Sequence, residues 1–235
     1  MKLALWTPAA RAFSAPFTEA LARSVELTVV TSEAAHRPPV ELDVYHVAND
    51  AAHGFVYRAL LERPGLVLLE SWELQALVFA ETAGRGAPRD FLREARRERG
   101  ESGAFIARQI LRGWGGALTP LLPLNQRVIE SAVALATTQQ GIRARAQARL
   151  AGRPSDTLAL DAATAGAAAD ALVRLARGAL ALLPEHTRAL EGARALEHTP
   201  LGRGLAELRS RARELGLGEL PRGLSPRIAA LLPDR

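Results

Sequence analysis

The sequence of 235 residues contains no cysteine, so disulfides, thiolate nucleophiles and cysteine-ligated metal sites are excluded. It also lacks any apolar run near the roughly 20 residues that a membrane-spanning helix needs. Aromatic residues make up only 5% of the chain, which argues against a base-stacking surface for nucleic acid. No serine stands in a Gly-x-Ser-x-Gly elbow, so no serine hydrolase triad can be assigned.

Lysine is almost absent as well, since Lys2 is the only one and arginine supplies nearly all of the basic charge. A formal net charge of +5 suits nucleic acid, anionic lipid or a phosphorylated ligand, but it indicates most simply a solvated arginine-rich surface. No nucleic-acid-binding motif is found, so we predict no nucleic-acid partner. Residues 1–8 are typical of a first strand and not of an export signal, and we therefore expect a cytoplasmic protein.

Short apolar segments alternate with amphipathic ones over the first two thirds of the chain. The clearest is Leu66–Leu69, a continuous apolar run after the turn signal Pro64-Gly65, as in a strand buried on both faces. Such alternation predicts a parallel sheet with right-handed crossovers, and Ser71 is expected to cap the helix after the fourth strand. Strands are expected at 2–6, 25–30, 42–47, 66–69, near the end of 128–137 and at 157–160, with helices at 17–23, 52–62, 90–99, 102–112 and 139–150.

The pattern changes after Asp161, where apolar residues recur at helical spacing and no convincing strand is found. Leucine stripes of this kind need a partner surface. We therefore predict an α/β fold: a single Rossmann-like parallel sheet flanked by helices in residues 1–161, with an all-helical C-terminal extension, residues 162–235, that packs back on it. Helices are expected at 167–183, 185–196, 201–215 and 226–232, separated by Pro184, Pro200 and a glycine-rich turn.

Four segments match, in order along the chain, the sequence pattern of a known protein family: Met1–Pro8, Tyr45–Asp50, Ala59–Gly65 and Pro123–Val128. Over roughly residues 1–160 they resemble the N-terminal domain of a group 1 (retaining, GT-B fold) glycosyltransferase. The resemblance implies two Rossmann-like domains, of which the first mostly binds the acceptor and the second binds the nucleotide-sugar. Because no second run of strand–helix units is found, we expect the donor domain to be missing and the C-terminal helices to resemble the family's returning tail.

Several positions that carry chemistry in that family hold other residues here. The family commonly has Leu-His-Asp-x-x-Leu-His-His where residues 69–76 read Leu-Glu-Ser-Trp-Glu-Leu-Gln-Ala. The loop Pro8–Pro16 has no glycine, so its backbone is poorly suited to close approach by a phosphate. Glu70 alone stabilises no departing nucleoside diphosphate, because that needs cations or oriented donors. We therefore predict no catalytic residue and expect no sugar transfer by the chain alone.

Polar residues gather at the predicted carboxyl ends of the strands, where open α/β sheets place their ligands. They allow two interpretations: contacts to a sugar or other small molecule, or a capping network in which Asn49 or Asp50 closes the first turn of the next helix. Trp72 is expected to fill part of the pocket, and Arg11 suits an anion. The five histidines offer no converging set, so neither a metal nor a cofactor is predicted. The candidate ligand-binding residues are His46, Asn49, His53, Glu70, Trp72 and Arg11.

The segment Phe105–Leu122 combines apolar bulk with Arg108 and Arg112. Such a segment lies at a bilayer surface in some proteins, docks a partner protein in others, and otherwise covers the core of its own domain as a helix hairpin. The sequence leaves these three alternatives open.

These observations favour a glycosyltransferase-like protein without a nucleotide-sugar domain, serving as a non-catalytic binding or assembly component with a protein partner or as a homo-oligomer. The resemblance implies a sugar or lipid-linked acceptor as ligand and bacterial surface-polysaccharide synthesis as the setting. The alternative is the acceptor-binding half of a split glycosyltransferase that is active only with a donor-domain partner. A standalone sugar or nucleotide binder is the third reading.

Overall fold

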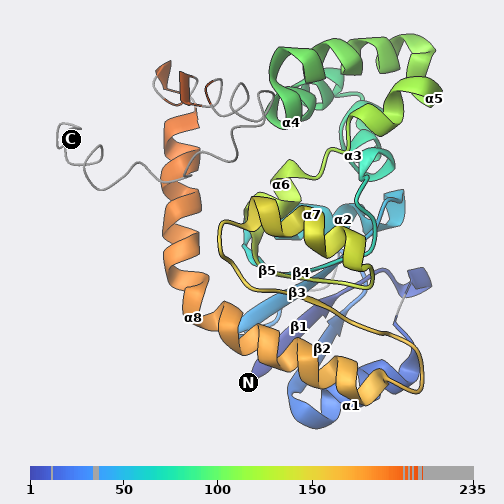
Figure 1. Cartoon of the computed structure of the whole chain (residues 1–235), viewed down its shortest axis with the longest axis vertical. Helices are drawn as coiled ribbons and strands as arrows, with labels where there is room; N and C mark the ends of the chain where they lie inside the picture. The colour runs from blue at the N-terminus through green and yellow to red at the C-terminus, as the bar shows by residue number, and fades with distance from the viewer. Residues whose placement is uncertain are drawn as a thin grey trace, which may run out of the picture.

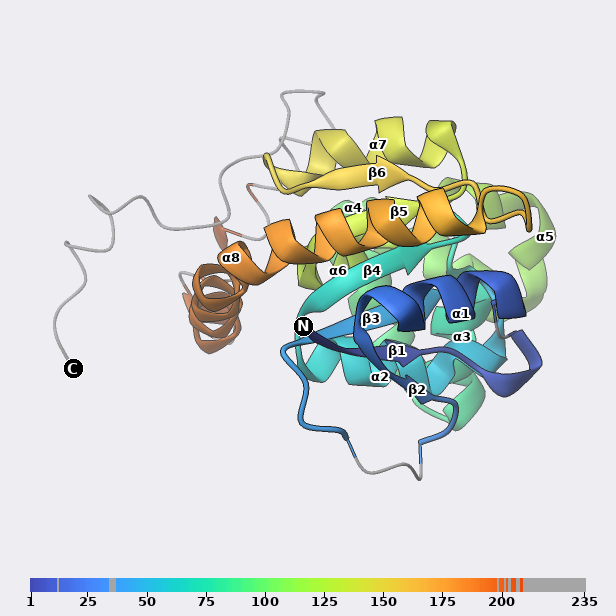
Figure 2. The same ribbon diagram turned by 90° about the horizontal axis from the view of Figure 1, so that it is seen from below.

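The structure, a computed structural model, describes residues 1–11, 13–33, 37–197, 199–200, 202, 204–205 and 208. It is built on a six-stranded sheet with the order β2-β1-β3-β4-β5-β6, in which every neighbouring pair is parallel (Figures 1 and 2). The predicted α/β fold with one Rossmann-like parallel sheet is therefore confirmed. The strands are β1 (Lys2–Trp6), β2 (Glu26–Val30), β3 (Leu42–Val47), β4 (Gly65–Leu69), β5 (Ala132–Thr137) and β6 (Ser155–Thr157).

Helices cover both faces of the sheet. On one face, α1 (Ala15–Ser24) and α8 (Ala165–Glu197) lie side by side, as Figure 2 shows. The other face carries most of the remaining helices. These are α2 (Gly54–Glu62), α3 (Gln75–Glu81), α4 (Pro88–Gln109), α6 (Gln126–Ser131) and α7 (Gln140–Leu150). The remaining short elements are α5 (Gly115–Leu118), η1 (Ala9–Arg11), η2 (Ala51–His53), η3 (Ala83–Arg85), η4 (Ile110–Trp114, a π-helical turn) and η5 (Thr119–Leu121).

Two apolar cores result from this arrangement, because successive strand residues point to opposite faces. In β1, Leu3 and Leu5 pack with α1 and α8, whereas Ala4 and Trp6 pack on the opposite side. Strands β3, β4 and β5 are buried along their whole lengths. Burial on both faces accounts for the near-continuous apolar runs that the sequence shows at these strands.

The C-terminal helix differs from prediction at Pro184. Two helices separated at this proline were expected, but α8 continues through it as one helix, and that expectation is wrong. A proline removes one backbone donor and kinks a helix, and good helix formers on both sides allow the helix to resume. Figure 1 shows the change of direction between the part of α8 along the sheet and the part that rises away from it. The predicted leucine stripe does find a partner surface, since Leu172 and Leu175 are buried in the core with α1.

The last strand also differs slightly from expectation. It was predicted at residues 157–160, but β6 pairs with β5 from Ser155 to Thr157. The apolar character of Leu158 has another cause, because this residue is buried in the core beside α8. The expected break between helices 90–99 and 102–112 is confirmed by left-handed backbone at Gly100 within α4. The helices predicted at 201–215 and 226–232 lie outside the described residues, apart from a few positions of the first.

Across the part of the chain that the structure describes, none of the helices combines the length and the apolar character that crossing a bilayer requires.

Candidate functional site

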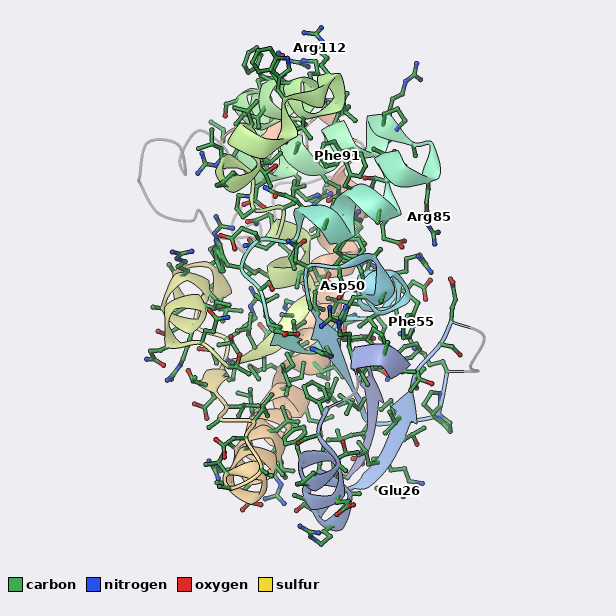
Figure 3. All side chains as sticks on the ribbon, turned by 90° about the vertical axis from the view of Figure 1, so that its right-hand side faces the viewer. Glu26, Asp50, Phe55, Arg85, Phe91 and Arg112 are labelled. Atoms are coloured by element: carbon green, nitrogen blue, oxygen red, sulfur yellow. The ribbon has the colours of Figure 1, made fainter. Side chains whose placement is uncertain are left out.

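The strand order reverses between β1 and β3, and open α/β sheets bind ligands outside the carboxyl ends of their strands at such a reversal. Here this edge carries Thr7 directly after β1, His46 near the end of β3 and Glu70 directly after β4. Figure 3 shows Asp50 just beyond the strand ends, below the first turns of the overlying helices. Of the residues that the sequence nominated as ligand contacts, His46 and Glu70 therefore lie together at one edge of the sheet.

His46 is the centre of a hydrogen-bonded row at this edge. Its Nδ1 lies 3.0 Å from Oγ1 of Thr7, and its Nε2 lies 3.1 Å from Oε2 of Glu70. Burial and the neighbouring His53 lower the pKa of His46, while Glu70 opposes the change. Because a carboxylate oxygen only accepts, a neutral ring donates from Nε2 to Glu70 and faces the Thr7 hydroxyl with Nδ1, and this hydroxyl also lies 3.3 Å from the carbonyl oxygen of Arg11. Since both nitrogens are occupied and His46 is 4% exposed, this imidazole is not free to contact a ligand.

The buried His53 and the partly exposed Asp50 form a second hydrogen-bonded pair beside it. Nδ1 of the fully buried His53 lies 3.0 Å from Oδ1 of Asp50, which also accepts from the backbone nitrogen of Ala52. Partial burial raises the pKa of the Asp50 carboxyl, but the hydrogen bond and charge of His53, with smaller contributions from Ala52 and Arg11, hold it below its usual range. Asp50 thus stays ionised and ties η2 to the strand edge, in agreement with the capping interpretation.

The loop after β1 contacts residues at the edge where the strand order reverses. The Phe13 ring lies 4.4 Å from the His46 ring, and Nε of Arg11 lies 3.2 Å from Oδ2 of Asp50. Arg11, which the sequence nominated for an anion, is therefore paired with a carboxylate of its own chain. Phe13 and Arg11 therefore lie against residues of the edge at which a doubly wound sheet usually holds its ligand.

Asn49 caps α3, a role that the sequence assigned to Ser71. Its Oδ1 accepts from the backbone nitrogens of Ala76 and Leu77, at 2.8 and 3.4 Å. The Ser71 prediction is wrong because α3 starts only at Gln75. The intervening segment is held away from helical geometry, since the backbone nitrogen of Leu74 donates to the carbonyl of Pro123.

A half-open depression of about 220 Å³ lies next to Glu70, at the carboxyl ends of β4 and β5. The half-buried Trp72 forms part of its wall, and its ring lies 5.2 Å from the Arg149 guanidinium and 5.9 Å from that of Arg145. Nε2 of Gln139 donates to the Glu70 carbonyl, which joins the two strand ends across the depression. The lining residues are Ser71, Trp72, Glu73, Gln139, Gly141, Ile142 and Arg145.

Comparison of the chain with protein-family models, with curated proteins and with solved structures finds no match. Among the residues that the structure places, no group of three or more histidine and acidic side chains could hold a metal ion. The function has to be inferred from the chemistry at the edge of the sheet.

A network of buried and partly buried polar groups holds the backbone of Trp72. Asn125 is fully buried; its Nδ2 donates to the Trp72 carbonyl and its Oδ1 accepts from Nη1 of Arg149, both at 2.7 Å. The same guanidinium nitrogen lies 3.1 Å from Oε1 of Glu98, whose other oxygen accepts from the backbone of Gln126. The network fixes both the backbone of Trp72 and one cation beside its ring.

The sequence pointed to Trp72 in the wall of this depression and to the neighbouring Glu70, but it missed Gln139 and Arg145 as contacts. A signal for them existed, because Gln139 follows the fifth strand as Glu70 follows the fourth. The rule that ligands gather at the carboxyl ends of parallel strands applies equally to both positions.

Proposed function

We propose that this chain is a glycosyltransferase-like binding component without catalytic activity of its own, which holds a sugar in the depression beside Trp72. The observation that carries the proposal is the meeting of Trp72 with Glu73, Gln139 and Arg145 around one cavity. An aromatic ring offers an apolar surface to the C–H groups of a sugar, while carboxylate, amide and guanidinium groups bond its hydroxyls. A volume of about 220 Å³ suits a small unit such as a monosaccharide.

Binding without transfer is favoured by the state of the other polar groups. A leaving nucleoside diphosphate has to be stabilised by cations or oriented donors. At this edge the carboxylates of Asp50, Glu70 and Glu73 oppose the approach of an anion, and Arg11 is engaged by Asp50. The cations nearest the depression, Arg145 and Arg149, lie by the Trp72 ring. The two histidines are buried and hydrogen-bonded within the protein, so neither is available to transfer a proton to a bound sugar.

The test is calorimetry and thermal unfolding with glucose, galactose, mannose, their disaccharides, UDP-glucose and GDP-mannose. A ligand at 100 times its Kd is expected to stabilise the native protein by about 2.7 kcal/mol, because it binds only the folded state. Trp72→Ala should abolish this stabilisation, whereas Trp114→Ala, on a distant and highly exposed ring, should retain it. Absence of binding by every sugar would contradict the proposal, and nucleoside diphosphate release by the isolated chain would contradict its non-catalytic part.

A second candidate, the acceptor-binding half of a split glycosyltransferase, is favoured by one observation. The Glu70 carboxylate is 50% exposed and is held by a hydrogen bond to His46, as a positioned general base requires, and Glu70 directly precedes Ser71 in the wall of the depression. In that case the chain acts with a protein partner that brings the donor domain. Glu70→Gln should then stop transfer in the complex while leaving sugar binding by the isolated chain unchanged. As a binding component, the chain would act with a protein partner or a second copy.

A further inference from the structure

The second half of α4, the π-helical turn η4 and α5 form an arm that projects beyond the sheet and its covering helices (Figure 1). Figure 3 shows Arg112 at the outer end of this arm, with its side chain pointing away from the protein. The chain reverses there through Gly113, whose φ of 98° is readily adopted only by glycine.

One side of the arm packs on the core and the other side is exposed and apolar. Ala104, Ala107 and Leu122 are fully buried, so the segment does cover its own domain, as one of the three sequence interpretations held. Four large apolar side chains of the arm and of the following turn η5 are exposed, and we call them the apical patch. They are Phe105 (57% exposed), Leu111 (37%), Trp114 (69%) and Leu121 (47%).

The apical patch is accompanied by positive charge without a compensating carboxylate. Arg108 and Arg112 are exposed, and neither has an ion-pair partner among the described residues. Residues 102–129 contain no aspartate or glutamate. Phe105 and Arg108 stand three positions apart and so share one face of α4, and Arg112 follows in η4.

We propose that the apical patch docks on an anionic lipid bilayer. Apolar and aromatic side chains enter the boundary between headgroups and acyl chains, while the two arginines bind lipid phosphates. The projecting shape of the arm suits a bilayer, because the end of the arm can enter the lipid surface before the rest of the protein reaches it. The proposal is independent of what the depression beside Trp72 binds.

A second copy of the chain is a less suitable occupant because of charge. A two-fold dimer through the apical patch would place Arg108 and Arg112 of one copy against the same patch of the other. Like charges brought together across an interface are destabilising. An anionic surface relieves this repulsion and satisfies the unpaired guanidinium groups.

The test is co-sedimentation of the full chain with vesicles of phosphatidylcholine alone or with one quarter phosphatidylglycerol. Binding is expected only to the anionic vesicles and should weaken with salt. Arg108→Gln with Arg112→Gln should lower the partition coefficient roughly 25-fold, at about five-fold for each arginine. The matched control, Arg23→Gln with Arg174→Gln, removes two exposed arginines from α1 and α8 and should bind like the wild type.

Direct insertion is tested by quenching of tryptophan fluorescence with bromine-labelled lipid. Quenching is expected in the wild type and should be lost in Trp114→Phe, because Trp6 is buried and Trp72 is half-buried elsewhere. Equal binding to neutral vesicles, or absence of binding to anionic ones, would overturn the proposal. It would also fail if sedimentation velocity showed a dimer that Trp114→Ala dissociates, which would assign the patch to a second copy.

Discussion

Nε2 of His46 lies 3.1 Å from Oε2 of Glu70, and the two residues come from the adjacent strand ends of β3 and β4. The imidazole is buried, whereas the carboxylate is 50% exposed. A buried neutral ring is thus joined directly to a group in contact with solvent. The arrangement makes the stability of this edge sensitive to pH.

The pH dependence has a definite sign. Because the pKa of folded His46 lies below its ordinary value of 6.5, the unfolded chain takes up the proton first as the pH falls. His46 should therefore lower the free energy of unfolding as the pH drops below 6.5, until the folded ring also becomes protonated. Thermal unfolding between pH 5 and 8 should show a weaker pH dependence in His46→Gln than in the wild type. Equal dependence in both proteins would rule out this role.

The cap of α3 is testable with two variants. Asn49→Ala should cost about 1 kcal/mol of stability, because the backbone nitrogens of Ala76 and Leu77 lose their acceptor. Ser71→Ala should change stability by less than about 0.5 kcal/mol, since Ser71 does not cap the helix. Urea denaturation measures both values. A larger loss of stability for Ser71→Ala than for Asn49→Ala would mean that Ser71, as the sequence indicated, caps α3.

Asn125 is a positioning residue for Trp72. Asn125→Ala should cost about 1–3 kcal/mol, because the buried Trp72 carbonyl and the Arg149 guanidinium each lose a partner. A purely structural role would leave the Trp72 environment unchanged in the native state. We expect instead more acrylamide quenching of fluorescence, and no such increase when Trp72→Phe is already present.

Two glycines should respond to alanine with opposite signs. A Cβ at Gly103 would overlap the carbonyl oxygen of Ala95, where the two halves of α4 meet, and Gly103→Ala should cost about 1–3 kcal/mol. Gly192 lies within α8 with open space around its Cβ position, so Gly192→Ala should add about 0.5–1 kcal/mol. Chemical denaturation of both variants provides the check. Stabilisation by Gly103→Ala would mean that the halves of α4 do not meet as described.

The limits of sequence-based prediction are clear at Ser71 and Pro184. Both residues are strong local signals, a capping side chain and a helix breaker. The first is overridden because Leu74 is held by the Pro123 carbonyl, and the second because α8 resumes beyond the kink. In each case the observed helix depends on residues farther along the chain than the few neighbours from which the prediction was made.

For this protein, the sequence by itself determined that strands and helices alternate and that polar residues follow the strands, because burial periodicity and turn residues act over a few neighbouring positions. Only the tertiary structure decided the strand order, the contact of Phe13 with His46 and the meeting of Trp72 with Arg149. Asn49 bonds a helix 27 residues away for the same reason. These contacts join distant parts of the chain, so they arise from packing the helices on the sheet and leave no local pattern.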